Sequence, residues 1–147
     1  MRLVKRTATI SLFVALMTGC SLLPGVRMNN LEYSVTPKAN EGEPILVDFV
    51  AVEGGRLTAQ LEHYTSEQWF KEKSDLLKKN AKGLIVWPIV VRPGTSVTLR
   101  NVPLYGKPAD NVFLFANYKS KGAHRLELER SRLIKLEFRD GDVYAVN

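Results

Sequence analysis

The stretch Ile45-Leu46-Val47-Asp48-Phe49-Val50-Ala51-Val52 is a nearly continuous apolar run that is rich in β-branched residues. Such a run predicts a β-strand that is covered on both faces or buried in the core of a sandwich, because a strand with one solvated face alternates apolar and polar side chains. Gly54 and Gly55 follow the run and predict its end. The stretch therefore indicates a fold built around a buried strand.

Further strands are predicted on both sides of this run. They cover residues 31–35, 84–87 together with 89–91, 97–99, 112–118, 125–129, 134–138 and 143–146. Pro88 interrupts one of them and favours an edge position or a bulge there. Asp140-Gly141 lies between two alternating runs, which predicts a hairpin.

The spacing of apolar residues becomes helical between the buried run and residue 84. Four large apolar side chains share one side of the predicted helix: Trp69, Phe70, Leu76 and Leu77. Thr65 and Gln68 have the spacing of a capping box at its start, and Lys73 falls within the apolar stripe, where it has to reach outward to water. The stripe indicates core packing or, alternatively, a surface for a partner.

Seven or eight strands with one helical insertion predict a mainly β fold, an antiparallel β-sandwich, over residues 31–147. About 128 residues after the predicted signal suit one domain with a single core.

Residues 1–19 have the pattern of an export signal. Three cations, Arg2, Lys5 and Arg6, precede an apolar run over residues 8–17 that is too short for an ordinary membrane span. Small residues at 18 and 19 precede Cys20, the only cysteine of the chain, as in the signals of lipid-modified proteins. We expect lipid on Cys20 and a tether over residues 20–30. Ordinary secretory cleavage and a retained membrane anchor are the alternatives.

The net charge gives little reason to expect nucleic acid as a partner. The formal charge of the whole chain is +6, and without the three cations of the signal it is +3. Acids are interspersed with the remaining cations, unlike the basic stripe typical of nucleic-acid binding. With its one cysteine assigned to lipid, the fold has no disulfide to support it.

The residues that could carry chemistry form no recognisable catalytic or metal site. For His63 and His124 we expect exposed or capping roles, since too few ligands surround them in the sequence for a metal. Asp140 and Asp142 flank a turn that offers too few oxygens for calcium. Ser96 follows a turn but has no neighbouring base. We expect no enzyme activity, no metal, no cofactor and no small-molecule substrate.

One polar loop is a candidate for binding a partner. It consists of Lys38, Ala39, Asn40, Glu41, Gly42 and Glu43, and it is predicted to be exposed between two strands. Loops on a rigid sandwich often bind other molecules, although a plain solvated connection explains this composition equally well.

The succession of motifs resembles one family. The residues that carry the resemblance are the signal ending at Cys20, residues 40–44 leading into 45–52, Phe70 and Leu76-Leu77, residues 91–94 before 97–99, and Phe115-Ala116-Asn117-Tyr118. Together they resemble the outer-membrane lipoproteins of type VI secretion, the TssJ family.

The resemblance implies an eight-stranded, transthyretin-like sandwich. It also implies that the loop over residues 38–43 contacts the periplasmic part of a large inner-membrane protein, TssM. Ser21 rather than Asp after the lipidated cysteine implies the periplasmic face of the outer membrane. The function expected is non-catalytic anchoring; the alternative is a periplasmic lipoprotein that inhibits an enzyme or binds a small ligand.

We expect Cys20→Ser to leave a folded but mislocalised protein, because the variant lacks the sulfur that would carry lipid. Fractionation of cell envelopes measures this directly. Normal outer-membrane fractionation of the variant would contradict the assignment of lipid to Cys20.

Overall fold

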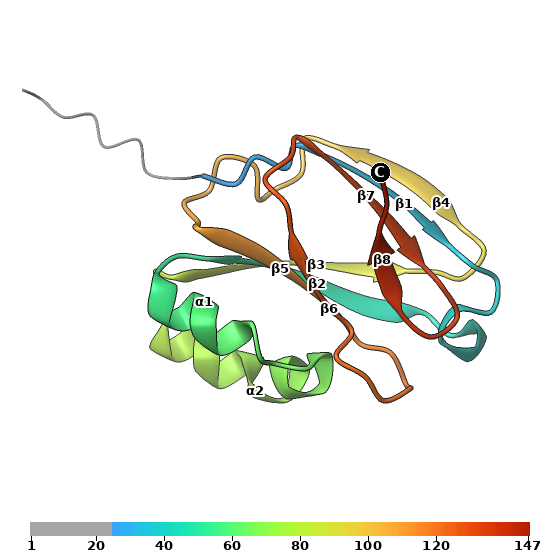
Figure 1. Ribbon diagram of the computed structural model, residues 1–147, viewed down its shortest axis with the longest axis horizontal. Helices are drawn as coiled ribbons and strands as arrows, with labels where there is room; N and C mark the ends of the chain where they lie inside the picture. The colour runs from blue at the N-terminus through green and yellow to red at the C-terminus, as the bar shows by residue number, and fades with distance from the viewer. Residues whose placement is uncertain (1–24) are drawn as a thin grey trace, which may run out of the picture.

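The computed structural model describes residues 25–147 as two four-stranded sheets that face each other, with two helices on the outer side of one sheet (Figure 1). The strands are β1 (Asn30–Val35), β2 (Ile45–Val52), β3 (Leu84–Val91), β4 (Ser96–Arg100), β5 (Asn111–Ala116), β6 (Arg125–Leu128), β7 (Leu133–Phe138) and β8 (Val143–Ala145). The strand orders are β4-β1-β7-β8 and β3-β2-β5-β6. The predicted β-sandwich is therefore confirmed.

The sequence predicted an antiparallel sandwich, and one strand pair departs from this prediction. Strand β1 pairs antiparallel with β4 but parallel with β7. The chain passes through the other sheet and both helices between β1 and β7, so no tight turn forces these two strands to run in opposite directions. All other strand pairs are antiparallel.

The predicted buried strand is β2, and it is covered on both faces. Val47, Phe49 and Ala51 belong to the core between the sheets, whereas Val50 and Val52 belong to a second core beneath the helices. Leu46 is the exception, with 50% of its surface exposed. Among the described residues, the members of the two cores extend from Val26 to Val143, so residues 25–147 have hydrophobic cores of their own.

The helical insertion consists of two helices, α1 (Gly55–Leu61) and α2 (Ser66–Lys79), instead of the single helix predicted. The capping box of α2 is confirmed, because the Gln68 amide donates to the Thr65 hydroxyl and the Gln68 side chain accepts from the Thr65 amide. Trp69 is fully buried and stacks on Phe115 with ring centroids 5.1 Å apart. Core packing of the apolar stripe is thus confirmed at Trp69.

A buried carboxylate joins α2 to β2. The Asp48 Oδ2 atom accepts from Trp69 Nε1 at 2.9 Å and from Lys73 Nζ at 3.0 Å. Asp48 is only 2% exposed, while the Lys73 side chain reaches the surface over the ring of Phe70. The predicted outward reach of Lys73 therefore also neutralises a buried charge, which makes burial of Asp48 tolerable.

The edge position predicted from Pro88 is confirmed, because β3 is the outer strand of its sheet. The strand is continuous across Pro88, which pairs with Asp48. Proline lacks an amide hydrogen, and an edge strand needs only one of its two sides for pairing.

The strand directions give the sandwich two distinct ends. The connections over residues 36–44, 92–95, 117–124 and 139–142 lie together at what we call the loop end. Gly25 and the connections over residues 80–83, 101–110 and 129–132 lie at the opposite end, which we call the N-terminal end (Figure 1).

The predicted tether over residues 20–30 is shorter than expected, because residues 25–29 pack on the domain and Asn30 starts β1. Val26 and Met28 are buried in the core between the sheets, and the Val26 amide donates to the Lys107 carbonyl at 2.9 Å. Their apolar side chains are more stable in this core than in water.

The predicted signal over residues 1–19 and Cys20 lie outside the described residues. Neither α1 nor α2 is long and apolar enough to cross a membrane.

We expect Lys73→Ala to lower the free energy of unfolding by about 1–3 kcal/mol, because it leaves the Asp48 carboxylate buried without a countercharge. The value lies below that of a fully buried pair because Lys73 is about one-third exposed. Lys71→Ala, on the exposed side of the same helix, is the control and should change stability by less than about 0.5 kcal/mol. Denaturant unfolding measures both; equal losses would show that the Asp48 contact contributes nothing.

Candidate functional site

The predicted partner-binding loop forms a short left-handed turn at the loop end. Residues Ala39–Gly42 make one 3₁₀ turn, in which Asn40, Glu41 and Gly42 have φ angles of 51°, 58° and 81°. Glycine adopts such angles freely, asparagine adopts them with some cost, and glutamate adopts them rarely. Three consecutive left-handed residues therefore require support from the rest of the fold.

Asn40 supplies this support. Its side-chain Oδ1 accepts from the Lys119 amide at 2.7 Å, and its Nδ2 donates to the Pro44 carbonyl at 3.2 Å. Its own amide donates to the Asp140 carbonyl at 3.0 Å. Asn40 thereby joins the turn to two other connections of the loop end.

The expectation of an exposed loop is wrong for two of its six residues. Ala39 is fully buried in the core between the sheets, and Asn40 is 5% exposed. The remaining members, Lys38, Glu41, Gly42 and Glu43, are exposed. Two residues of the loop therefore anchor it in the fold, and the other four are exposed to solvent.

Glu41 is a highly exposed charge of the turn. Its side chain is 78% exposed, and its Oε2 lies 3.7 Å from Lys119 Nζ, which is exposed as well. An ion pair of this kind contributes little to stability, because water screens it and ordering both side chains costs entropy. Both charges are therefore available to another molecule at little loss to the fold.

His124 lies beside this turn and is buried, contrary to the expected exposed or capping role. It is 3% exposed, has a φ of 43°, and stacks on the ring of Tyr118 at a centroid distance of 4.8 Å. Its Nδ1 lies 2.9 Å from Asp142 Oδ1, so it links the β5–β6 connection to the β7–β8 hairpin. A lone histidine in a polar segment carries no periodic signal from which this burial could be predicted.

Ser120, His124 and Asp142 have the residue types of a hydrolytic triad but not its geometry. His124 Nε2 lies 2.8 Å from the Ser120 carbonyl oxygen and 3.5 Å from the Ser120 hydroxyl. A ring nitrogen that faces a carbonyl oxygen carries a proton, so it cannot take one from the hydroxyl. The arrangement acts as a structural link rather than an activated nucleophile.

Tyr118 ties the same region together. Its hydroxyl lies 2.9 Å from both the Arg139 and the Asp142 carbonyl oxygens, to which it donates. Burial, with smaller contributions from nearby acids including Asp142, raises the pKa of Tyr118 well above the ordinary 10.0. The hydroxyl therefore keeps the proton that it donates to the hairpin.

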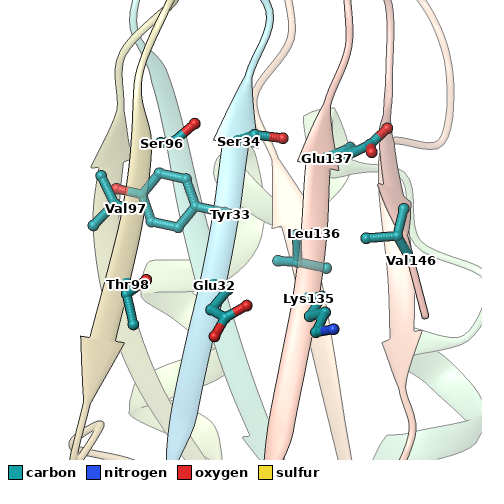
Figure 2. A pocket seen from close by; sticks show the side chains of 10 residues that line it. All are labelled: Glu32, Tyr33, Ser34, Ser96, Val97, Thr98, Lys135, Leu136, Glu137 and Val146. Atoms are coloured by element: carbon teal, nitrogen blue, oxygen red, sulfur yellow. The ribbon is translucent and has the colours of Figure 1, made fainter.

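A hollow of about 310 Å³ lies over the outer face of the β4-β1-β7-β8 sheet (Figure 2). Figure 2 shows Thr98, Glu32 and Lys135 at one level, with Ser96, Ser34 and Glu137 at the next. Glu32 pairs directly with Lys135 in the register, so opposite charges face each other across neighbouring strands. Ligand pockets are mostly enclosed, and this hollow is wide open, so it does not favour the ligand-binding alternative. Among the described residues, no three His, Cys, Asp or Glu side chains cluster as metal ligands would.

No protein-family model matches the chain, and a search of curated proteins gives no match. Solved structures do resemble it. One, described as "Type VI membrane complex", has a TM-score of 0.62 and 12% identity and covers 82% of this chain and 99% of its own. The chain has the fold of type VI secretion components.

Two of the similar structures are lipoproteins or membrane-bound. Serratia marcescens Lip, described as a membrane bound component of the type VI secretion system, has a TM-score of 0.57 and 12% identity, covering 81% of this chain and 95% of that one. The type VI secretion lipoprotein TssJ1 from Pseudomonas aeruginosa has a TM-score of 0.54 and 12% identity, covering 80% and 92%. The likeness to TssJ-like proteins is thus found in structure as well as in the motifs.

We expect the conformation of the turn over residues 38–43, and with it the stability of this TssJ-like fold, to depend on Asn40 and not on Glu41. Asn40→Ala removes the side-chain bonds to the Lys119 amide and the Pro44 carbonyl and should lower the free energy of unfolding by about 1–3 kcal/mol. Glu41→Ala at the neighbouring exposed position should change it by less than about 0.5 kcal/mol. Thermal and denaturant unfolding of both variants test this, and a stable Asn40→Ala variant would refute the assigned role of Asn40.

Proposed function

We propose that the chain is a non-catalytic component of a type VI secretion membrane complex, anchored in the outer membrane and facing the periplasm. Lipid on Cys20 would hold the bilayer. The turn over residues 38–43 would bind the periplasmic part of a large inner-membrane component similar to TssM. The N-terminal end of the sandwich would then face the membrane, and the loop end would bind the partner.

The observation that carries the proposal is the position of a rigidly held, charged turn at the end opposite Gly25. The turn is fixed by Asn40 and Ala39 inside a fold that resembles solved type VI secretion components over about four-fifths of the chain. A strained backbone that the fold holds in place is often part of a binding site. This supports the loop end as the face turned toward a partner.

The exposed charges of the turn are suited to recognising a partner by electrostatic complementarity. Lys38, Glu41 and Glu43 combine both signs within six residues, and opposite charges on a partner would fix the register of docking. Because the turn is already ordered, binding loses little conformational freedom. We expect a contribution of a few kcal/mol, strengthened when membrane anchoring confines both proteins to one compartment.

The anchor would lie close to the domain. Cys20 precedes Gly25 by five residues, and such a segment spans at most about 18 Å. Two or three acyl chains on one residue hold a protein stably, whereas a single chain binds reversibly. The sandwich would therefore stay near the bilayer with its N-terminal end toward it.

We expect the triple substitution of Lys38, Glu41 and Glu43 by alanine to abolish recovery of the inner-membrane partner. The full chain, tagged and crosslinked in cell envelopes, is pulled down and its partners are identified. Ala39, Asn40 and Gly42 stay unchanged, so the turn keeps its shape and the melting temperature should hold.

A matched control changes Glu32, Lys135 and Glu137 to alanine on the sheet face of Figure 2, which removes the same number and signs of charges. This control should still recover the partner. Loss of the partner in both variants would contradict a role specific to the turn. Recovery of a soluble enzyme in place of the inner-membrane protein would favour the inhibitor alternative. A small ligand that the unchanged protein binds and the sheet-face control variant does not bind would favour the ligand-binding alternative.

A further inference from the structure

We infer that the N-terminal end of the sandwich is a basic surface that contacts anionic phospholipid headgroups. The inference goes beyond a lipid on Cys20, because it assigns membrane contact to the folded domain itself. It fixes how the domain is oriented on the bilayer.

One part of this surface lies at the end of α2. Four exposed cations surround the connections from β2 to α1 and from α2 to β3: Arg56, Lys78, Lys79 and Lys82. The C-terminal dipole of a helix offsets about half a unit of positive charge, so most of this charge remains uncompensated. The helix end therefore presents a strong positive field to whatever faces it.

The other part lies where the described chain begins. Five exposed cations lie close to Gly25, either in the segment that follows it or at the nearby strand ends and connections: Arg27, Arg100, Lys107, Arg130 and Arg132. The Arg130 guanidinium donates to the Gly25 carbonyl, and the amides of Asn29 and Asn30 donate to the Arg132 carbonyl. These bonds place the cations around the point from which the chain leads back to Cys20.

The carboxylates at this end do not balance the cations. Nine cations face five carboxylates: Glu53, Asp75, Asp110, Glu127 and Glu129. Residues 25–147 as a whole carry 18 Lys and Arg against 15 acids. The N-terminal end thus holds a larger positive surplus than the entire domain, and the rest of the domain is slightly acidic.

A bilayer is the occupant that the charge of this end and the proposed anchor favour, and in this step the inference rests on the proposed lipid on Cys20. Lipid on Cys20 would bring a bilayer within about 18 Å of Gly25, because only five residues separate the two. Attraction between exposed charges decays over about 8–10 Å in physiological salt, so only cations at this end would feel anionic headgroups. Basic residues commonly act with a lipid chain as a second anchoring signal.

The consequence is a defined orientation. The eight residues of β2 extend about 26 Å from the N-terminal end toward the loop end. With its basic end on the headgroups, the domain would hold the turn over residues 38–43 away from the bilayer and toward the periplasm.

The test is binding of residues 25–147, which contain both cores and no lipid site, to phosphatidylcholine vesicles with about 30% phosphatidylglycerol in about 0.1 M salt. The variant Lys78→Gln, Lys79→Gln, Lys82→Gln should bind at least about tenfold more weakly, because each cation near an anionic surface contributes about fivefold. A second variant, Arg100→Gln, Lys107→Gln, Arg132→Gln, should show the same loss.

The matched control is Lys38→Gln, Lys119→Gln, Lys121→Gln, which removes three exposed charges at the loop end and should bind within about threefold of the unchanged protein. Melting temperatures establish that all variants fold. Equal losses at both ends, or equal binding to vesicles of phosphatidylcholine alone, would overturn the inference.

Failure here is distinguishable from failure of the proposed function. The vesicle experiment uses neither lipid on Cys20 nor the secretion partner. Fractionation of Cys20→Ser and recovery of the partner remain as independent tests of the anchor and the turn.

Discussion

Strand β2 lies between the two cores, and its single charged side chain, Asp48, is held by the Trp69 indole and the Lys73 ammonium. The contact fixes α2 over the sheet, and Trp69 then stacks on Phe115 of the neighbouring strand. A carboxylate at this depth is unfavourable without its partners, so it specifies where the helix must lie. The helices cover the outer face of one sheet in this way, and the start of α2 meets the connection over residues 117–124 through the Ser66 amide, which donates to the Ala123 carbonyl.

The loop end is built as one unit. The buried side chains of Asn40, Tyr118 and His124 join three connections through partly buried hydrogen bonds, and these connections come from distant parts of the chain. Their rigidity supports a turn whose backbone would otherwise be unfavourable. The opposite end differs in character, because the described chain begins there and cations outnumber acids. The two proposals, partner contact at the loop end and membrane contact at the N-terminal end, are based on this division.

Much of the fold could be predicted because its signals are local. The apolar run of β2, the Thr65 capping box and the Asp140-Gly141 hairpin each depend on residues close together in the sequence. The parallel pairing of β1 with β7 could not be predicted, since alternation shows which face of a strand is buried but not which strand lies beside it. The same limit applies to the site: composition suggested the loop, whereas the anchoring of Asn40 by the Lys119 amide depends on a contact 79 residues away.

The most direct test of the account is to place a photocrosslinking residue at position 41 or at position 79 of the full chain and to identify what each captures in intact cell envelopes. Glu41 lies on the turn of the loop end and Lys79 on the basic surface, and both are exposed. We expect position 41 to capture a large inner-membrane protein and position 79 to capture phospholipid. Capture of the protein from position 79, or of lipid from position 41, would contradict the assignment of the two ends.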